Sequence, residues 1–125
     1  MESAPKNDFA EYKFKNGILC IRIKKKRFID LSAAKRIVRD RLDYQGGKSY
    51  PILCDIRWIH KFDKAAKDYF VNDGSHMIKA IAYLVTPNLN YIMYKYFIAF
   101  QKGTIKTQAF LELKQALAFL EEFSE

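Results

Sequence analysis

Few residues in this chain have the types and spacing that catalysis or metal binding requires. His60 and His76 are the two imidazoles, and neither stands near the paired Cys or acidic residues of a zinc site. Cys54 falls within an apolar, strand-like run, and Ser75 adjoins His76 without a third group to orient the pair. We therefore predict a protein that is not an enzyme and has no metal site and no cofactor.

A glycine-rich segment, Gly46-Gly47-Lys48-Ser49, resembles the end of a phosphate-binding P-loop. That motif needs another glycine five positions before Gly47, where this chain has Leu42. The order of elements also differs, because a P-loop leads from a strand into a helix and this segment follows a predicted helix. The sequence indicates that the two glycines end a helix and do not bind a nucleotide.

Four charged residues, Asp55, Arg57, Asp63 and Lys64, surround the loop that follows a predicted central strand. Ligands of open α/β sheets bind at the carboxyl ends of the strands, where this loop would lie. Two interpretations are open for these residues. They either form ion pairs and cap a helix, or they contact a ligand or a partner protein.

Hydrophobic periodicity divides the chain into alternating strands and helices. Asn16-Gly17 is typical of a tight hairpin turn, and Asp30 and Asp63 each precede a helical pattern that they can cap. The run Tyr50–Ile56 is almost continuously apolar, which favours a central strand with parallel neighbours. The predicted strands are 8–14, 18–24, 50–56, 78–85 and 104–110, and the predicted helices run from Asp30 to Gly46, from Asp63 to Asn72, over 89–101 and over 111–123.

This order of elements, ββαβαβαβα, predicts an α/β fold with a single mixed sheet. We expect about five strands, parallel in the centre of the sheet, and about four helices packed against them. The 125 residues form one domain, 1–125, in which residues 1–8 are expected to be a flexible tail. Half of the residues are apolar and 15% are aromatic, which excludes a disordered chain.

Basic residues are concentrated in the first half of the chain. The 22 Lys and Arg against 14 Asp and Glu give a net charge of +8, and the first 60 residues hold 14 basic and 7 acidic side chains. Such a charge attracts phosphate groups, acidic protein surfaces or anionic lipid. We interpret the run Lys24–Arg27 and the helical Lys35, Arg36, Arg39 and Arg41 as a solvated surface. Nucleic acid is disfavoured because the run lacks interleaved aromatic residues.

The sequence contains no pattern typical of export or membrane insertion. Charged residues interrupt the first sixteen positions, and the uncharged stretch 80–94 is too short for a transmembrane helix. Cys20 and Cys54 both lie in apolar runs, where a buried reduced thiol is the common state. These features predict a cytoplasmic protein with free cysteines and no transmembrane segment.

The predicted helix 89–101 is apolar on two sides, because a second line of apolar residues accompanies its inner stripe. Tyr91, Tyr94 and Ile98 form this second line, and a helix of this kind must be covered twice. Three kinds of cover are open: the last helix, a second copy of the chain or a partner, and a lipid-like ligand or membrane surface. Lys95 or Lys102 would meet the acidic group of such a ligand. Tyr91, Tyr94, Lys95 and Ile98 are therefore candidate ligand or interface residues.

Several segments together have the pattern of a known family. They are Ile29–Lys35, Pro51–Arg57, Ala80–Pro87, and Thr107–Phe110 followed by Gln115–Leu120. In sequence and order they resemble the SpoIIAA-like branch of the STAS superfamily, which has the anti-sigma-factor-antagonist fold. The resemblance extends over nearly the whole chain and is closest to an uncharacterised bacterial group.

The resemblance implies a non-enzymatic module that binds a partner protein. Regulatory STAS proteins are switched when a kinase phosphorylates a Ser or Thr at the start of the helix after the central strand. Asp63 matches the family's acidic residue, but Lys64 stands where that hydroxyl is expected, so we predict binding without this phosphoswitch. The expected contact residues are Asp55, Arg57, Trp58, Phe62, Asp63, Lys64 and Thr86.

Trp58 is the residue on which this hypothesis most depends. A lone Trp in a loop between a strand and a helix is either an interface anchor or a partly buried lid over the core. Two functions remain open. One is a protein-interaction or regulatory module that binds a partner protein or a second copy. The other is a carrier or sensor of a lipid-like or other small amphipathic anion near helix 89–101.

Overall fold

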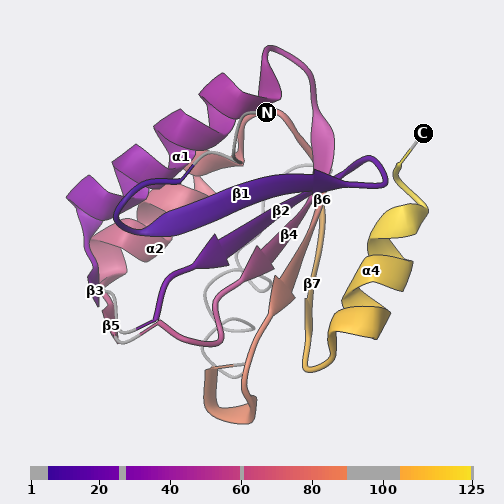
Figure 1. Ribbon diagram of the computed structural model, residues 1–125. Coiled ribbons are helices and arrows are strands. Elements are labelled where there is room, and N and C mark those ends of the chain that lie inside the picture. Colours follow the sequence, from indigo (N-terminus) through magenta and orange to yellow (C-terminus); the bar gives the residue numbers. More distant parts are fainter. Residues whose placement is uncertain (1–5, 26–27, 60, 90–104, 125) are drawn as a thin grey trace.

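A five-stranded mixed sheet lies at the centre of the fold, with helices on both of its faces (Figure 1). This computed structural model describes residues 6–25, 28–59, 61–89 and 105–124. The strands follow the order β1-β2-β4-β6-β7 across the sheet. The elements are β1 (Ala10–Lys15), β2 (Ile18–Ile23), β3 (Phe28–Ile29), α1 (Leu31–Gln45), β4 (Tyr50–Asp55), β5 (Lys61–Phe62), α2 (Lys64–Val71), the short 3₁₀ helix η1 (Asp73–Ser75), β6 (Ile78–Leu84), β7 (Lys106–Phe110) and α4 (Leu113–Glu121).

The strand pairing confirms the predicted mixed sheet. β1 and β2 form an antiparallel hairpin, and the turn residues Asn16 and Gly17 have positive φ angles of 52° and 81°. The pairs β2–β4, β4–β6 and β6–β7 are all parallel, which places β4 at the centre as its apolar sequence predicts. Because these four strands run in the same direction, their carboxyl ends meet at one edge of the sheet.

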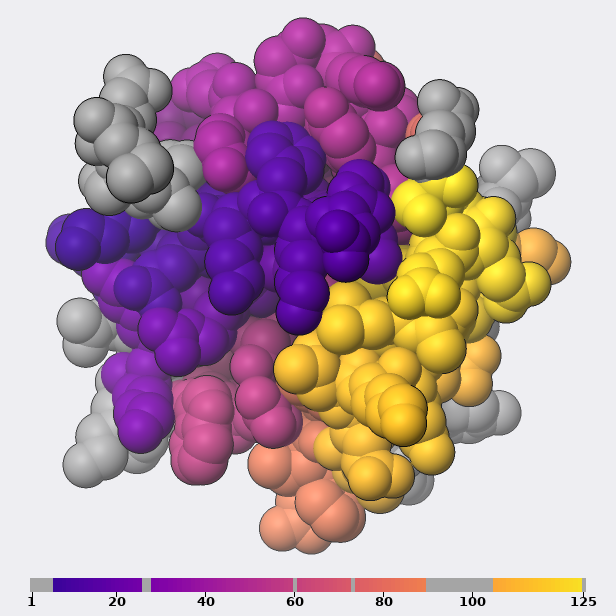
Figure 2. All heavy atoms as spheres, turned by 45° about the vertical axis from the view of Figure 1, so that its right-hand side comes forward, coloured from indigo at the N-terminus to yellow at the C-terminus, as the bar shows by residue number. Residues whose placement is uncertain are grey.

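Helices cover the two faces of the sheet and bury two separate cores. α1 and α2 cover one face, where Ile37 and Ile52 belong to the larger core. α4 covers the other face, where Leu53 and Leu120 belong to the smaller core. Figure 2 shows this second face, on which α4 lies next to the β1–β2 hairpin. β4 contributes to both cores, which explains why its sequence is apolar on both sides.

Capping residues set the ends of the helices as the sequence predicts. The Asp30 side chain accepts a hydrogen bond from the backbone N–H of Ala33 at 2.8 Å, which begins α1. Gly46, with a φ of 62°, ends α1 by donating its N–H to the carbonyl of Leu42. Within the described residues, no helix is both long and apolar enough to cross a membrane.

Arg41 departs from the solvated surface that we expected for the basic residues of this helix. It is only 3% exposed, whereas the other three basic residues of α1 are exposed. Arg41 follows Ile37 by four positions and Val38 by three, so the helical repeat places it on the inner stripe. Its guanidinium donates to the carbonyls of Gly74 and His76, each at 3.0 Å. Arg41 therefore joins the end of α1 to η1.

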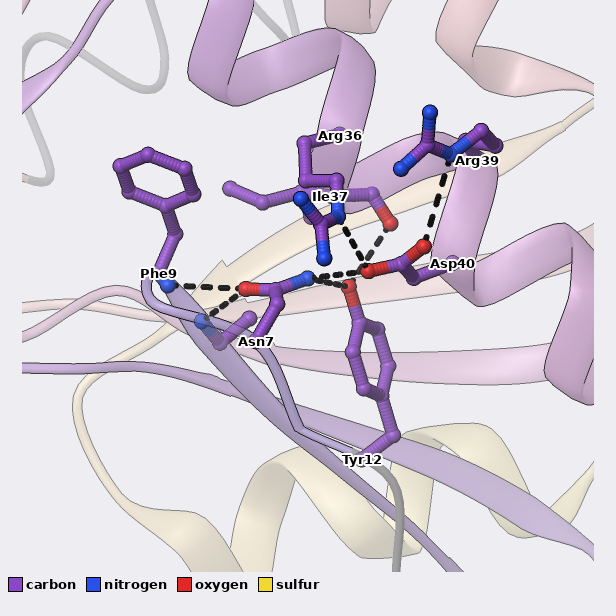
Figure 3. Close-up of polar contacts among 8 residues, drawn as sticks. Asn7, Phe9, Tyr12, Arg36, Ile37, Arg39 and Asp40 are labelled. Carbon is purple, nitrogen blue, oxygen red and sulfur yellow. Dashed lines mark hydrogen bonds and ion pairs between the residues drawn. The ribbon is translucent and has the colours of Figure 1, made fainter.

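A network of hydrogen bonds joins the segment before β1 to α1 (Figure 3). Asn7 Oδ1 accepts from the backbone N–H groups of Phe9 and Ala10, each at 2.8 Å. Asn7 Nδ2 donates to Asp40 Oδ2 at 2.7 Å, and the Tyr12 hydroxyl donates to a carbonyl of α1 at 2.8 Å. The network fixes α1 against the first strand of the sheet.

The flexible tail predicted for residues 1–8 does not extend as far as Asn7. Asn7 is 8% exposed and hydrogen-bonded on both sides of its amide, because its side chain forms the turn that leads into β1. Burial alone would raise the pKa of Asp40, but hydrogen bonds from Asn7 and Arg36 outweigh this effect and hold the pKa below its usual value. The ionised carboxylate is therefore the form that the network stabilises.

Replacing Asn7 with Ala tests the contribution of this network. We expect Asn7→Ala to lower the free energy of unfolding by about 1–3 kcal/mol, because the buried N–H of Ala10 loses its acceptor. Urea denaturation measures the change. Lys35→Ala, an exposed substitution on α1, is the control and should change stability by about 0.5 kcal/mol or less. An effect of Asn7→Ala no larger than this control would contradict the prediction.

Candidate docking surface at the carboxyl edge of the sheet

Two segments that lie far apart in the sequence meet at the carboxyl edge of the sheet. The parallel strands β2 and β4 end at Ile23 and Asp55. The segment after β2 contains the short strand β3, the segment after β4 contains the short strand β5, and these two strands also pair with each other. β3 pairs with β5 in parallel, with Phe28 opposite Lys61 and Ile29 opposite Phe62. Figure 1 shows this small ladder next to the beginnings of α1 and α2.

Each of these segments presents an aromatic ring beneath a lysine of the other. Lys25 Nζ lies 5.1 Å from the ring centroid of Trp58, and Lys61 Nζ lies 5.4 Å from that of Phe28. Trp58 is 49% exposed and Phe28 is 44% exposed. Exposed cation–π pairs contribute about 0.5–1 kcal/mol each, enough to orient the rings without burying them. We call Lys25, Phe28, Trp58 and Lys61 the rim surface.

Trp58 is half-exposed at the carboxyl edge of the sheet, with 49% of its surface accessible. The neighbouring Ile56 is 2% exposed and Ile59 is half-buried, so both contribute to the cover of the core. Because Trp58 is partly buried and also leaves apolar area accessible, the partly buried lid and the interface anchor both stay predictions.

Asp55 and Arg57 form a closed pair at the end of β4. The Asp55 carboxylate accepts from the Arg57 backbone N–H at 3.1 Å, from Nε at 3.0 Å and from an Nη at 2.9 Å. The hydrogen bond to Asp55 raises the pKa of Arg57. Asp55 is only 8% exposed, so its oxygens are used within the turn. This pair holds the loop that presents Trp58.

Asp63 and Lys64 also have local roles at the start of α2. Asp63 Oδ1 accepts from the N–H of Ala66 at 2.9 Å, which is the geometry of an N-cap. Lys64 is exposed and its Nζ lies 2.7 Å from Asp68 Oδ2, one helical turn further on. Phe62 is half-buried and makes an edge-on contact with the ring of Phe70, with centroids 5.7 Å apart.

Thr86 lies at the same edge of the sheet, two residues after β6. Leu84 at the end of β6 pairs with Asp55, which fixes this position relative to β4. Thr86 Oγ1 accepts from the backbone N–H of Leu89 at 3.4 Å, at the beginning of a helical turn. The predicted contact residues thus share one edge, but the four charged ones form separate pairs and caps in place of a single cluster.

Sequence patterns do not identify three of the four residues of the rim surface. Lys25 belongs to the basic run that we interpret as solvated, and Phe28 and Lys61 belong to no motif. The one useful signal is the position of Phe28, an aromatic residue directly after a basic run and before a capped helix. The candidate residues Tyr91, Tyr94, Lys95 and Ile98 lie outside the described residues, and their roles stay predictions.

The remaining candidates for chemistry are consistent with structural roles. Cys20 and Cys54 are free, as expected, and burial raises the pKa of the Cys54 thiol to about 12. No group of three or more His, Cys, Asp or Glu side chains that could hold a metal occurs among the described residues. His76 contributes a backbone carbonyl to Arg41.

A family model described as Domain of unknown function (DUF7793) matches residues 12–124. The chain belongs to this family. The matched DUF7793 region extends from within β1 past the end of α4, so it includes the complete carboxyl edge of the sheet. No curated protein matches the chain. The DUF7793 description gives no activity and no link to STAS proteins, and that resemblance stays a prediction.

The N-cap of α2 can be tested independently of binding. We expect Asp63→Ala to lower the free energy of unfolding by about 0.5–2 kcal/mol, because the N–H of Ala66 loses its acceptor. Asp63→Ser keeps a capping oxygen and should cost less. Urea denaturation of both variants measures the difference, and equal losses would show that Asp63 does not act as a cap.

Proposed function

We propose that the chain is a non-enzymatic, regulatory protein-interaction module that binds an acidic, partly apolar segment of a partner protein through the rim surface. The observation that carries the proposal is the pairing of each half-exposed ring with a lysine from the other segment. The rings offer apolar area that a partner can bury, and the ammonium groups offer charge complementary to carboxylates. In this reading the module is cytoplasmic and acts as the STAS resemblance implies.

The chemistry of the rim surface supports an acidic partner more than a second copy of the chain. Buried aromatic anchors supply much of the binding free energy of protein interfaces, and Trp is the residue most enriched among them. Arg57 and the basic run that begins at Lys24 lie in the segments that carry the rim surface. Because each chain carries a net charge of +8, self-association through this basic surface would bring like charges together.

The local structure around Lys64 supports regulation without phosphorylation at this position. Lys64 is the first residue of α2 and forms an ion pair with Asp68 on the next turn. Its positive charge has the opposite sign to that of a phosphate group. Binding through the rim surface would therefore be regulated by the concentration of the partner protein, or by a modification at another position of the chain.

Selection from a random peptide library tests the proposal without a known partner. Trp58 is the single Trp of the chain, so its fluorescence reports directly on the rim surface when a selected peptide is titrated. We expect the selected peptides to be rich in Asp, Glu and apolar residues and to bind more weakly as salt increases. Peptides of any other composition, or none at all, would contradict the proposal.

Matched variants assign the binding to the rim surface. The double variant Lys25→Gln/Lys61→Gln should weaken peptide binding at least about fivefold, and Phe28→Ala at least about tenfold, through lost charge and lost apolar contact. The control Lys106→Gln/Lys114→Gln removes two exposed lysines from β7 and α4 and should leave affinity within about twofold. Equal losses in both double variants would indicate non-specific attraction and overturn the assignment.

A further inference from the structure

The two faces of the sheet differ in how much of their width a helix covers. On one face α1 and α2 pack side by side. On the other face α4 is the one α-helix of the described residues, and it packs on β4, β6 and β7. Figure 2 shows the surface of the β1–β2 hairpin exposed beside α4. The hairpin half of this face is therefore accessible to an occupant.

A groove separates α4 from the hairpin. Its volume is about 410 Å³, which is within the range of binding clefts. Cys20 of β2 and Leu53 of β4 are neighbours in the strand register and form its floor. Leu113 and Leu117, one turn apart on α4, form one wall. Leu113 is 44% exposed, and Cys20 and Leu117 are half-buried, so the groove offers accessible apolar area.

The opposite wall of the groove is basic. Lys13 and Lys15 are both exposed and both line the groove, because residues two apart on a strand lie on the same face. Lys13 is opposite Cys20 in the hairpin, so it borders the apolar floor. Neither lysine forms an ion pair within the part of the chain that the structure describes.

The acidic residues that line the groove are already paired. Glu11 forms an ion pair with Arg22, which lies opposite it in the hairpin. The hydrogen bond from Arg22 lowers the pKa of Glu11, so the carboxylate stays ionised. Asp55 is held by Arg57 at the end of β4. The charge that the groove offers to an occupant therefore comes from its two lysines.

The space above the hairpin has the width of one α-helix. α4 packs mainly on β6, and β2 is two strands away in the sheet. Neighbouring strands are about 4.8 Å apart, so this distance is about 9.6 Å. The axes of packed helices are about 8–10 Å apart. A helix centred over β2 would therefore pack beside α4, as α2 packs beside α1 on the other face.

The spacing of the two lysines also matches a helix. Residues two apart on a strand are separated by about 6.6–6.8 Å, and residues four apart on a helix by about 6 Å along the axis. Two Asp or Glu residues one turn apart could therefore face Lys13 and Lys15 together. A second copy of the chain would bring its own net charge of +8 to these lysines, which disfavours self-association here.

We propose that this groove is a docking site for an acidic amphipathic α-helix of a partner protein. The apolar line of that helix packs against Leu113, Leu117 and Cys20, and the adjacent acidic line pairs with Lys13 and Lys15. The docked helix completes the layer that α4 begins on this face. None of the four residues of the rim surface lines the groove, so this inference does not depend on the proposed function.

Cys20 reports directly on occupation of the groove. The chain has two cysteines, and the thiolate is the form that reacts with iodoacetamide. Burial raises the pKa of the Cys54 thiol to about 12, so Cys20 is alkylated first in mildly alkaline solution. Mass spectrometry follows the rate of this alkylation with and without a bound peptide.

A library of stapled helical peptides tests the proposal. It is selected against the full chain carrying Lys25→Gln/Lys61→Gln, which removes the charges of the rim surface, and the selected peptides are then measured on the unaltered chain. We expect them to carry two acidic residues four positions apart beside an apolar line and to slow alkylation of Cys20 at least about tenfold at saturation. Selection of no peptide, or of peptides that leave Cys20 equally reactive, would overturn the proposal.

Two matched pairs of variants assign the binding to the groove. Lys13→Gln/Lys15→Gln should weaken peptide binding at least about fivefold, whereas Lys35→Gln/Lys48→Gln, at exposed positions outside the groove, should leave it within about twofold. Leu113→Gln should also weaken binding at least about fivefold. Its control is Leu111→Gln, because Leu111 is 50% exposed and does not line the groove. Equal losses within either pair would refute the site.

Other occupants give different results in the same assay. Sodium decanoate replaces the peptide in one experiment, and in another the chain alone is alkylated over a range of concentrations. We expect no protection of Cys20 in either. Protection by decanoate but by no peptide would indicate an acyl chain, and protection that grows with protein concentration would indicate a second copy. Either result would contradict a docked partner helix.

Discussion

The parallel alignment of β2, β4 and β6 is the constraint on which the rest of the structure depends. Because these strands run in the same direction, each chain segment that leaves them emerges at the same edge of the sheet. The segments after β2 and β4 therefore run side by side and pair again as β3 and β5. Without that alignment Lys25 would not reach Trp58, nor Lys61 reach Phe28, because each pair joins residues more than 30 positions apart.

The acidic side chains at the carboxyl edge already accept hydrogen bonds from nearby residues. This determines which side chains the edge can offer to a partner. Asp55 is used by Arg57, and Asp30 and Asp63 are used as N-caps. The side chains that project from the same segments are then two rings and two lysines. The edge therefore presents apolar area and positive charge, although Asp30, Asp55 and Asp63 lie in the same segments.

The parts of the fold that sequence could predict are those with a local cause. Asn16-Gly17 specifies the hairpin through its positive φ angles, Asp30 and Asp63 specify helix starts, and the apolar run of β4 specifies its central place. β3 and β5 contain two residues each, which is too few for any periodicity to predict them. They exist because the tertiary arrangement brings the segments together.

The difference between local and tertiary causes also explains which residues of the candidate site the sequence could predict. A lone Trp such as Trp58 is conspicuous in a sequence, whereas the role of Phe28 and Lys61 depends on the contact between them. Arg41 was wrongly placed on the solvated face because it belongs to a series of basic residues, although its spacing from Ile37 put it on the inner stripe. An arginine is usually exposed to solvent, but the position of Arg41 in the helical repeat places it in the core.

Arg41 further shows how a buried charge is compatible with a stable fold. It lies one turn before the end of α1, where its guanidinium also donates to Gln45 Oε1. The carbonyls of Gly74 and His76 add two more negative dipole ends and hold η1 against the helix. These neutral groups reduce the cost of burial without cancelling a unit charge. Burial of Arg41 is therefore compatible with the fold, and its hydrogen bonds join α1 to η1.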